Sequence, residues 1–136
     1  MYAVFEHTAD LGIKVSAPTL DMLLADAARG LTAVIGGGAL DIEPRQEDTF
    51  HVTGTDPVWL LADWVGEVLA AFDTRRMLYR DFVVVVGPTG LEARARGEPY
   101  DPVRHVLAHE VKAVTQHLLD VHRTADGWQA TFVVDI

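Results

Sequence analysis

The groups best suited to chemistry lie near the two ends of the chain. The side-chain carboxylate of Asp135 and the α-carboxylate of Ile136 are one residue apart. Two anions held this close need a counter-charge, which a hard divalent cation with oxygen ligands supplies. If strand ends bring Asp10 to the same place, Ca²⁺, Mg²⁺ or Mn²⁺ would suit the site better than Zn²⁺. Spacing alone nevertheless favours a simpler interpretation, with a turn aspartate, a surface charge and a frayed terminus.

Histidines offer a second chemistry, because His7, His105, His109 and His117 occur among acidic residues such as Glu98. Histidine and carboxylate pairs serve as general acids and bases. The sequence contains no GxSxG, HExxH or GxxxxGK[ST] string, however, so no standard catalytic site is indicated. A single histidine is more often structural than catalytic.

Positive charge concentrates locally only at Arg94, Arg96 and Arg104. This group fits an acidic partner or a nucleotide, but the polar side of an edge strand is the favoured interpretation. Arg104 and Lys112 fit a solvated surface as well as a functional site.

Composition excludes several classes of protein. The chain has 136 residues, no cysteine and a net charge of -9. The lack of cysteine rules out disulfides, a thiolate zinc site and a cysteine nucleophile, and it suits a reducing cytoplasm. No signal peptide or membrane span is predicted. The negative charge disfavours direct, non-specific RNA binding, which depends on Lys and Arg.

Local patterns predict two helices and several strands that would position these groups. Thr19 and Asp56 are capping residues ahead of apolar residues at helical spacing, and Pro57 strengthens the second helix start. Turn signals at 87–90 and at Asp126–Gly127 predict two hairpins. The segment 101–110 fits either a loop or a short helix. Strands are expected at 2–7, 11–17, 49–53, 82–86, 91–97, 113–121 and 128–136, and helices at 20–35 and 57–72.

The order of these elements predicts the fold class. Strands and helices do not alternate regularly, which argues against a doubly wound parallel sheet. We expect an α+β fold, with two helices packed on one face of a mainly antiparallel sheet. The chain has no internal repeat or low-complexity linker, so residues 1–136 are expected to form a single domain.

Four strings together resemble the archease family. They are EHTADLGI (6–13), GEPYDPVRH (97–105), HEVKAVTQH (109–117) and VDI (134–136), and their order and spacing agree over essentially the whole chain. The resemblance implies a strand–helix–strand–strand core and a bound divalent cation, Ca²⁺ with Mn²⁺ or Mg²⁺ as alternatives. It also implies a cofactor protein of the GTP-dependent 3′-phosphate RNA-splicing ligase, which promotes ligase guanylylation and multiple turnover in tRNA splicing and RNA repair.

Roles carry over only where residues match the family motifs. Asp10, Asp135 and Ile136 would be the metal ligands, the last through its carboxylate. Gln116 stands where the family commonly has Tyr, and His109 is a smaller departure, so a partner contact is in question rather than the metal site. The remaining matches would support the site or contact the ligase: His7, Glu98, Arg104, His105, Lys112 and His117.

Two other functions compete with that of a ligase activator. One is a stand-alone metal-dependent phosphoester hydrolase, in which Asp10 and Asp135 hold the ion and His7 or His105 is the general base. The other is a general chaperone or adaptor, for which these aspartates would not matter. As an activator, the protein would contact the ligase directly and RNA only indirectly, without a membrane.

Overall fold

The computed structural model describes residues 1–7, 9–37 and 40–136, apart from the side chains of Glu6 and His7. Its element order begins with two strands, and each helix is followed by a strand. The elements are β1 (Tyr2–His7), β2 (Asp10–Ala17), α1 (Leu20–Gly36), β3 (Gln46–Thr53), α2 (Pro57–Arg75), β4 (Met77–Gly87), β5 (Gly90–Pro99), β6 (Ala113–Thr124) and β7 (Gly127–Asp135).

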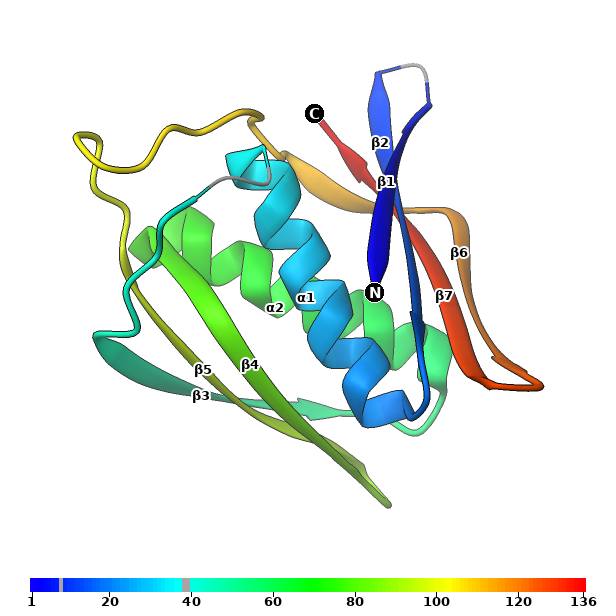
Figure 1. Cartoon of the computed structure of the whole chain (residues 1–136). Helices are drawn as coiled ribbons and strands as arrows, with labels where there is room; N and C mark the ends of the chain where they lie inside the picture. Colours follow the sequence, from blue (N-terminus) through cyan, green and yellow to red (C-terminus); the bar gives the residue numbers. More distant parts are fainter. Residues whose placement is uncertain (8, 38–39) are drawn as a thin grey trace.

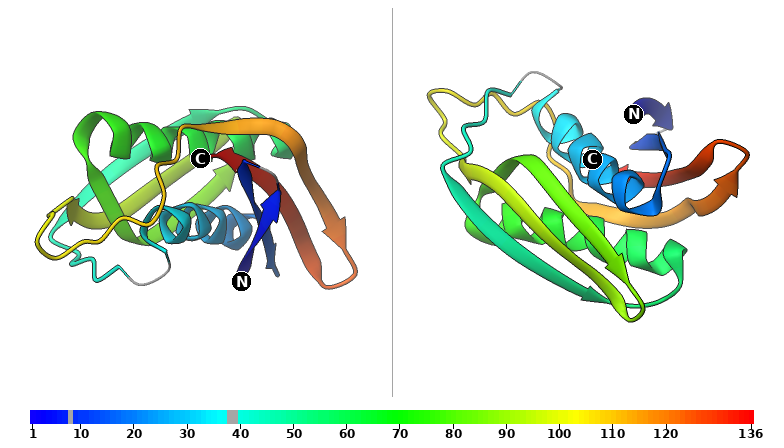
Figure 2. Two further views of the ribbon diagram at one scale, coloured as in Figure 1. Left: turned by 90° about the horizontal axis from the view of Figure 1, so that it is seen from above. Right: turned by 60° about the horizontal axis from the view of Figure 1, so that its bottom comes forward.

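The strands form two antiparallel sheets. One has four strands in the order β1-β2-β7-β6, and the other has three in the order β3-β5-β4. Both helices lie between the sheets, since α1 contacts β2 and β4 while α2 contacts β6 and all three strands of the smaller sheet (Figures 1 and 2). The predicted α+β class is confirmed, and β3–α2–β4–β5 has the expected strand–helix–strand–strand order. The expected single sheet is divided in two, so the helices are covered on two sides.

The helix boundaries follow from their capping residues. Thr19 Oγ1 accepts a hydrogen bond from Met22 N at 3.2 Å, and Asp56 Oδ1 accepts one from Val58 N at 2.9 Å. Each bond satisfies a backbone donor that has no partner within the helix. Gly37 ends α1 in the left-handed region at φ 69°, a conformation that glycine adopts without a steric penalty. Both predicted helix starts are therefore confirmed.

The core is centred on aromatic residues between the helices and the smaller sheet. Trp64 of α2 is fully buried, and its ring packs edge-on against Phe50 and Phe82 at centroid distances of 5.3 and 6.1 Å. Trp64 Nε1 donates to Leu24 O at 2.8 Å, which joins α2 to α1 and satisfies the indole N–H inside the core. This packing holds the three-stranded sheet in place. The chain that leads to β6 begins at the end of β5 in that sheet.

The structure decides one open question and corrects one expectation. Residues 100–112, which we call the connecting loop, contain a turn at 102–104 and otherwise irregular chain, so the loop alternative for 101–110 is the observed one. Strand β5 is the middle strand of its sheet, so Arg94 and Arg96 do not lie on an edge. Arg104 forms ion pairs with Glu98 and Glu43, and Arg96 forms one with Glu47. Among the described residues, neither helix is long and apolar enough to cross a bilayer.

Candidate functional site

The two aspartates from opposite ends of the sequence meet across adjacent strands. Asp10, the first residue of β2, is the register partner of Asp135, the last residue of β7. Side chains of directly opposed residues in an antiparallel pair lie on the same face of the sheet, with Cβ atoms about 5 Å apart. The Ile136 N–H donates to Ala9 O at 3.4 Å, so the residue after Asp135 is also tied to the start of β2. The convergence expected of these three residues is thus observed in the backbone.

This set of donors fits a hard cation. Like charges placed opposite one another in a sheet destabilise it, and a divalent ion with oxygen ligands would remove that cost. Asp10 and Asp135 supply two carboxylates, and the third candidate is the α-carboxylate of Ile136. Among the described residues, no three His, Cys, Asp or Glu side chains group closely enough to hold a metal. In the ligand set that the resemblance implies, the α-carboxylate would be the further ligand, and water or a partner would complete the coordination of a Ca²⁺ ion.

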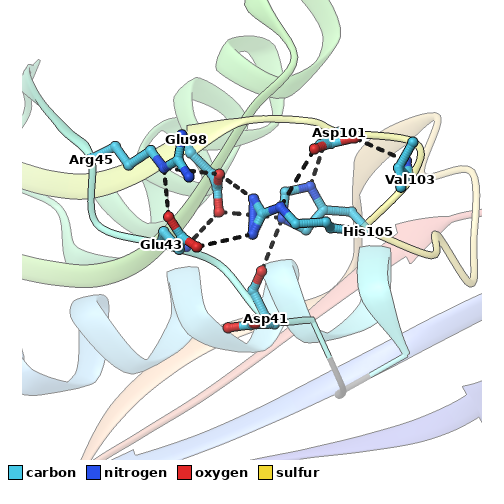
Figure 3. Close-up of polar contacts among 8 residues, drawn as sticks. Asp41, Glu43, Arg45, Glu98, Asp101, Val103 and His105 are labelled. Carbon is cyan, nitrogen blue, oxygen red and sulfur yellow. Dashed lines mark hydrogen bonds and ion pairs between the residues drawn. The ribbon is translucent and has the colours of Figure 1, made fainter.

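A second cluster surrounds Glu98 at the end of β5 (Figure 3). Glu98 is only 3% exposed. Its Oε2 accepts a hydrogen bond from Glu43 N at 2.5 Å, and its Oε1 accepts one from Arg104 Nη2. Arg45 Nε lies 3.8 Å from Oε1. This buried carboxylate is therefore surrounded by donors from the segment after α1 and from the connecting loop.

His105 is held at both ring nitrogens. Its Nδ1 accepts a hydrogen bond from Asp101 N at 2.8 Å, so Nε2 carries the proton of the neutral ring and points to Asp41 O at 3.0 Å. Nε2 also lies 3.4 Å from Glu98 Oε2. The ring is 1% exposed and stacks on Tyr100 with 6.2 Å between centroids. Both nitrogens are occupied and shielded from water, which disfavours the general-base role that the hydrolase hypothesis gives His105.

The electrostatics of Glu98 favour its charged form. Burial by itself opposes ionisation, but the Glu43 N–H and the Arg104 guanidinium hold the pKa of the Glu98 carboxyl below its usual value. Arg104 shows the reciprocal effect, since its hydrogen bond to Glu98 raises the guanidinium pKa. We call Asp41, Glu43, Arg45, Glu98, Asp101, Arg104 and His105 the Glu98 network.

The Glu98 network is linked to the strand-end carboxylates through the connecting loop. The loop is anchored at Tyr100 N to Arg76 O (2.7 Å), at Ala108 N to Ile35 O (2.8 Å) and at Lys112 N to Asp135 O (2.8 Å). At its last residue, Lys112, the loop is therefore bonded to Asp135, which lies opposite Asp10. The predicted metal ligands and the predicted supporting residues Glu98, Arg104 and His105 therefore lie in two clusters, joined by one segment of anchored chain.

The other predicted residues have different positions. The side chain of Lys112 is exposed, and so is that of His117. His117 lies in β6 just after Thr115, where the register with β7 shifts, and its N–H donates to Thr115 Oγ1 at 3.2 Å. Gln116 and His109 are also exposed. The side chain of His7 lies outside the described residues, so its predicted role stays a prediction.

Sequence reasoning missed the contribution of the segment after α1. Asp41 contributes its carbonyl oxygen, Glu43 its backbone N–H and carboxylate, and Arg45 its guanidinium. The only local signal was the alternation of charges around Pro44 in Glu43-Pro44-Arg45. Nothing in that string indicated that its partner was Glu98, 55 residues further along the chain.

Comparisons with known proteins agree with this architecture. The chain matches the model of the archease protein family (MTH1598/TM1083) over residues 2–136. It is 43% identical to protein archease of Methanopyrus kandleri, covering 96% of both chains. It is 36% identical to protein archease of Pyrococcus furiosus, covering 97% of this chain and 96% of that one.

Solved structures show the same fold. The solution structure of Methanobacterium thermoautotrophicum protein 1598 matches with a TM-score of 0.83 and 29% identity, covering 99% of this chain and 98% of that one. The crystal structure of a Thermotoga maritima archease, described as a possible chaperone, matches with a TM-score of 0.64 over 100% of this chain and 98% of that one. Its 23% identity supports the fold alone. With the family model and the relatives both covering nearly the full length, the chain belongs to the archease family.

Proposed function

We propose that this protein is a metal-binding activator of the GTP-dependent 3′-phosphate RNA-splicing ligase. It would promote guanylylation of the ligase and its repeated turnover in tRNA splicing and RNA repair, in the cytoplasm, without turnover chemistry of its own. The observation that carries the proposal is the register pairing of Asp10 with Asp135, next to Ile136, in a member of the archease family.

A metal bound by these groups would act by neutralising charge at the strand end, which requires no catalytic base. A divalent cation bound by Asp10, Asp135 and the α-carboxylate of Ile136 would neutralise charges that otherwise repel. A rigid, neutralised strand end can favour one conformation of a partner, and it shifts that equilibrium only by its differential affinity for the two states. The net charge of -9 favours approach to a ligase cleft that binds RNA through basic residues.

The test measures guanylylation of the ligase with GTP and Mn²⁺, with and without this protein. Wild type should stimulate the reaction, whereas Asp10→Asn and Asp135→Asn, which remove charge but keep shape, should not. Asp63→Asn is the matched control, because Asp63 is an exposed carboxylate on α2. Equal stimulation by all four proteins would refute the metal-dependent mechanism.

The same proteins separate the competing functions. Release of product from phosphodiester substrates by the purified protein, lost in Asp135→Asn, would indicate a hydrolase instead. Suppression of aggregation of unrelated proteins, unchanged in Asp135→Asn, would indicate a general chaperone. A peptide bond after Ile136 removes the α-carboxylate, so one added residue should weaken both ion binding and stimulation of the ligase.

A further inference from the structure

Two valines of the connecting loop project into solvent. Val103 is 91% exposed and Val106 is 78% exposed. Single exposed apolar side chains are common on protein surfaces and need no explanation. These two differ in two ways. The irregular loop that carries them is anchored by hydrogen bonds, and charged residues lie close to it.

The conformation of the loop is set by hydrogen bonds at Asp101 and by the buried ring of His105. The Val103 N–H donates to Asp101 Oδ1 at 2.9 Å, and the His105 N–H donates to Asp101 O at 2.7 Å, which closes the turn (Figure 3). His105, between the two valines, is one of the two buried residues of the Glu98 network, with Glu98. Long loops without secondary structure are uncommon in compact domains and are usually functional. A loop already held in one conformation loses little entropy on binding, so its exposed side chains can contribute more to affinity.

The loop is also placed next to the proposed metal site. In the view of Figure 1 the connecting loop, the end of β7 and the β1–β2 end of the larger sheet all lie at the top of the molecule. Lys112 N donates to Asp135 O, so the loop ends at the strand-end carboxylates. From there the loop runs toward the side of the molecule opposite β1 and β2 (Figure 1), so a partner that contacts both the carboxylates and the valines must span this end of the molecule.

Charge around the valines indicates the kind of partner. The Glu98 network that holds the loop has four carboxylates against two guanidinium groups. Glu98 is buried and paired with Arg104, so the excess negative charge at the surface comes from Asp41, Glu43 and Asp101 against Arg45. An acidic surface with two apolar projections is complementary to an apolar pocket with a basic rim. An enzyme that binds RNA must carry Lys and Arg along its cleft.

We propose that Val103 and Val106 are the apolar anchors by which this protein docks on a basic-rimmed pocket at the margin of the ligase's RNA-binding cleft. This inference rests on the proposed function, because it takes the ligase as the partner. It assigns to the Glu98 network the task of holding the two valines in the binding conformation. The network would be a positioning device rather than a catalytic one.

The test compares Kd for the ligase between wild type, the double variant Val103→Ser/Val106→Ser and the control Val83→Ser/Val85→Ser. The control valines lie on β4 and are 54% and 59% exposed. We expect the loop variant to raise Kd about tenfold or more, which corresponds to about 1.4 kcal/mol. The control should leave Kd unchanged. Kd of wild type should also rise with salt, because screening weakens the interaction with the basic rim.

The possible results are distinguishable. If wild type binds and the loop variant binds as tightly, or both double variants weaken binding equally, the docking proposal is wrong and the ligase-activator function stands. If wild type neither binds the ligase nor stimulates its guanylylation, the proposed function fails, and this inference fails with it. Thermal unfolding of each variant shows whether a change in Kd reflects the surface or a loss of folded protein.

Discussion

Replacing Glu98 by Gln should destabilise the protein strongly, although the two side chains have nearly the same shape. The neighbours of Glu98 are all donors: the Glu43 N–H, the Arg104 and Arg45 guanidinium groups and the His105 Nε2–H. A carboxylate accepts hydrogen bonds from the Glu43 N–H and from Arg104, and its charge also attracts Arg45. An amide must turn its NH₂ group toward one of these donors, and it carries no charge to stabilise the rest.

The size of the effect follows from the hydrogen bonds that the amide cannot form. One hydrogen bond that involves charged groups contributes about 1.5 to 3 kcal/mol, and the side chain is only 4% exposed, so water offers little compensation. With the weakening of the remaining bonds, we expect a loss of about 3 kcal/mol of unfolding free energy. For 136 residues, an unfolding entropy of about 2.1 cal/mol/K per residue converts this into a fall in Tm of about 10 °C.

The assay is thermal unfolding followed by circular dichroism at pH 7, with Glu92→Gln as the matched control. Glu92 lies on the same strand, but its side chain is 81% exposed and its Oε1 lies 3.8 Å from His51 Nδ1. Its replacement should change stability by less than about 0.5 kcal/mol. If Glu98→Gln lowers Tm no more than Glu92→Gln does, the network does not hold the loop as we argue.

The pH dependence gives an independent check on the same residue. Because contacts in the folded state lower the Glu98 pKa, the unfolded chain binds this proton more readily than the folded one. The stability contributed by the charge is therefore complete above the unfolded pKa of about 4.3 and is lost as pH falls through the folded value. The stability difference between wild type and Glu98→Gln should be constant near pH 7 and should shrink in acid. A difference that persists unchanged to pH 2 would contradict this account.

Three further predictions follow from other parts of the structure. Gly97→Ala should cost more than about 2 kcal/mol, measured by urea unfolding, because its Cβ would lie 1.8 Å from Leu78 O, a backbone atom that cannot move aside cheaply; a neutral effect would show that β4 and β5 can separate. Burial and the hydrogen bond to Asp48 raise the Tyr79 pKa, so in wild type this tyrosine ionises first in the unfolded chain and stability falls above pH 10. Tyr79→Phe should reduce that loss of stability, and identical alkaline unfolding curves for the two proteins would refute this. Calcium at about 100 times its Kd should raise the unfolding free energy of wild type by about 2.7 kcal/mol but not that of Asp135→Asn; an equal shift in both proteins would place the ion elsewhere.

Local structure could be predicted from the sequence because its causes are local. Thr19 and Asp56 cap the two helices through residues that follow within three positions, and a Gly in the left-handed region ends α1. The hairpins form around Gly90 and Gly127, the first residues of β5 and β7. These signals act over a few residues, so each can be inferred without knowing the rest of the fold.

The sequence by itself therefore determined the elements, the α+β class and the residues worth suspecting, because capping, turn formation and apolar periodicity depend on near neighbours. Only the tertiary structure decided that the strands divide into two sheets, that Asp10 pairs with Asp135, and that Glu43 and Arg104 both bond to Glu98. Those outcomes depend on strand register and on the packing of α1 and α2 between the sheets, which join residues tens of positions apart. No local pattern encodes such a pairing, because its free energy comes from burying distant segments against one another.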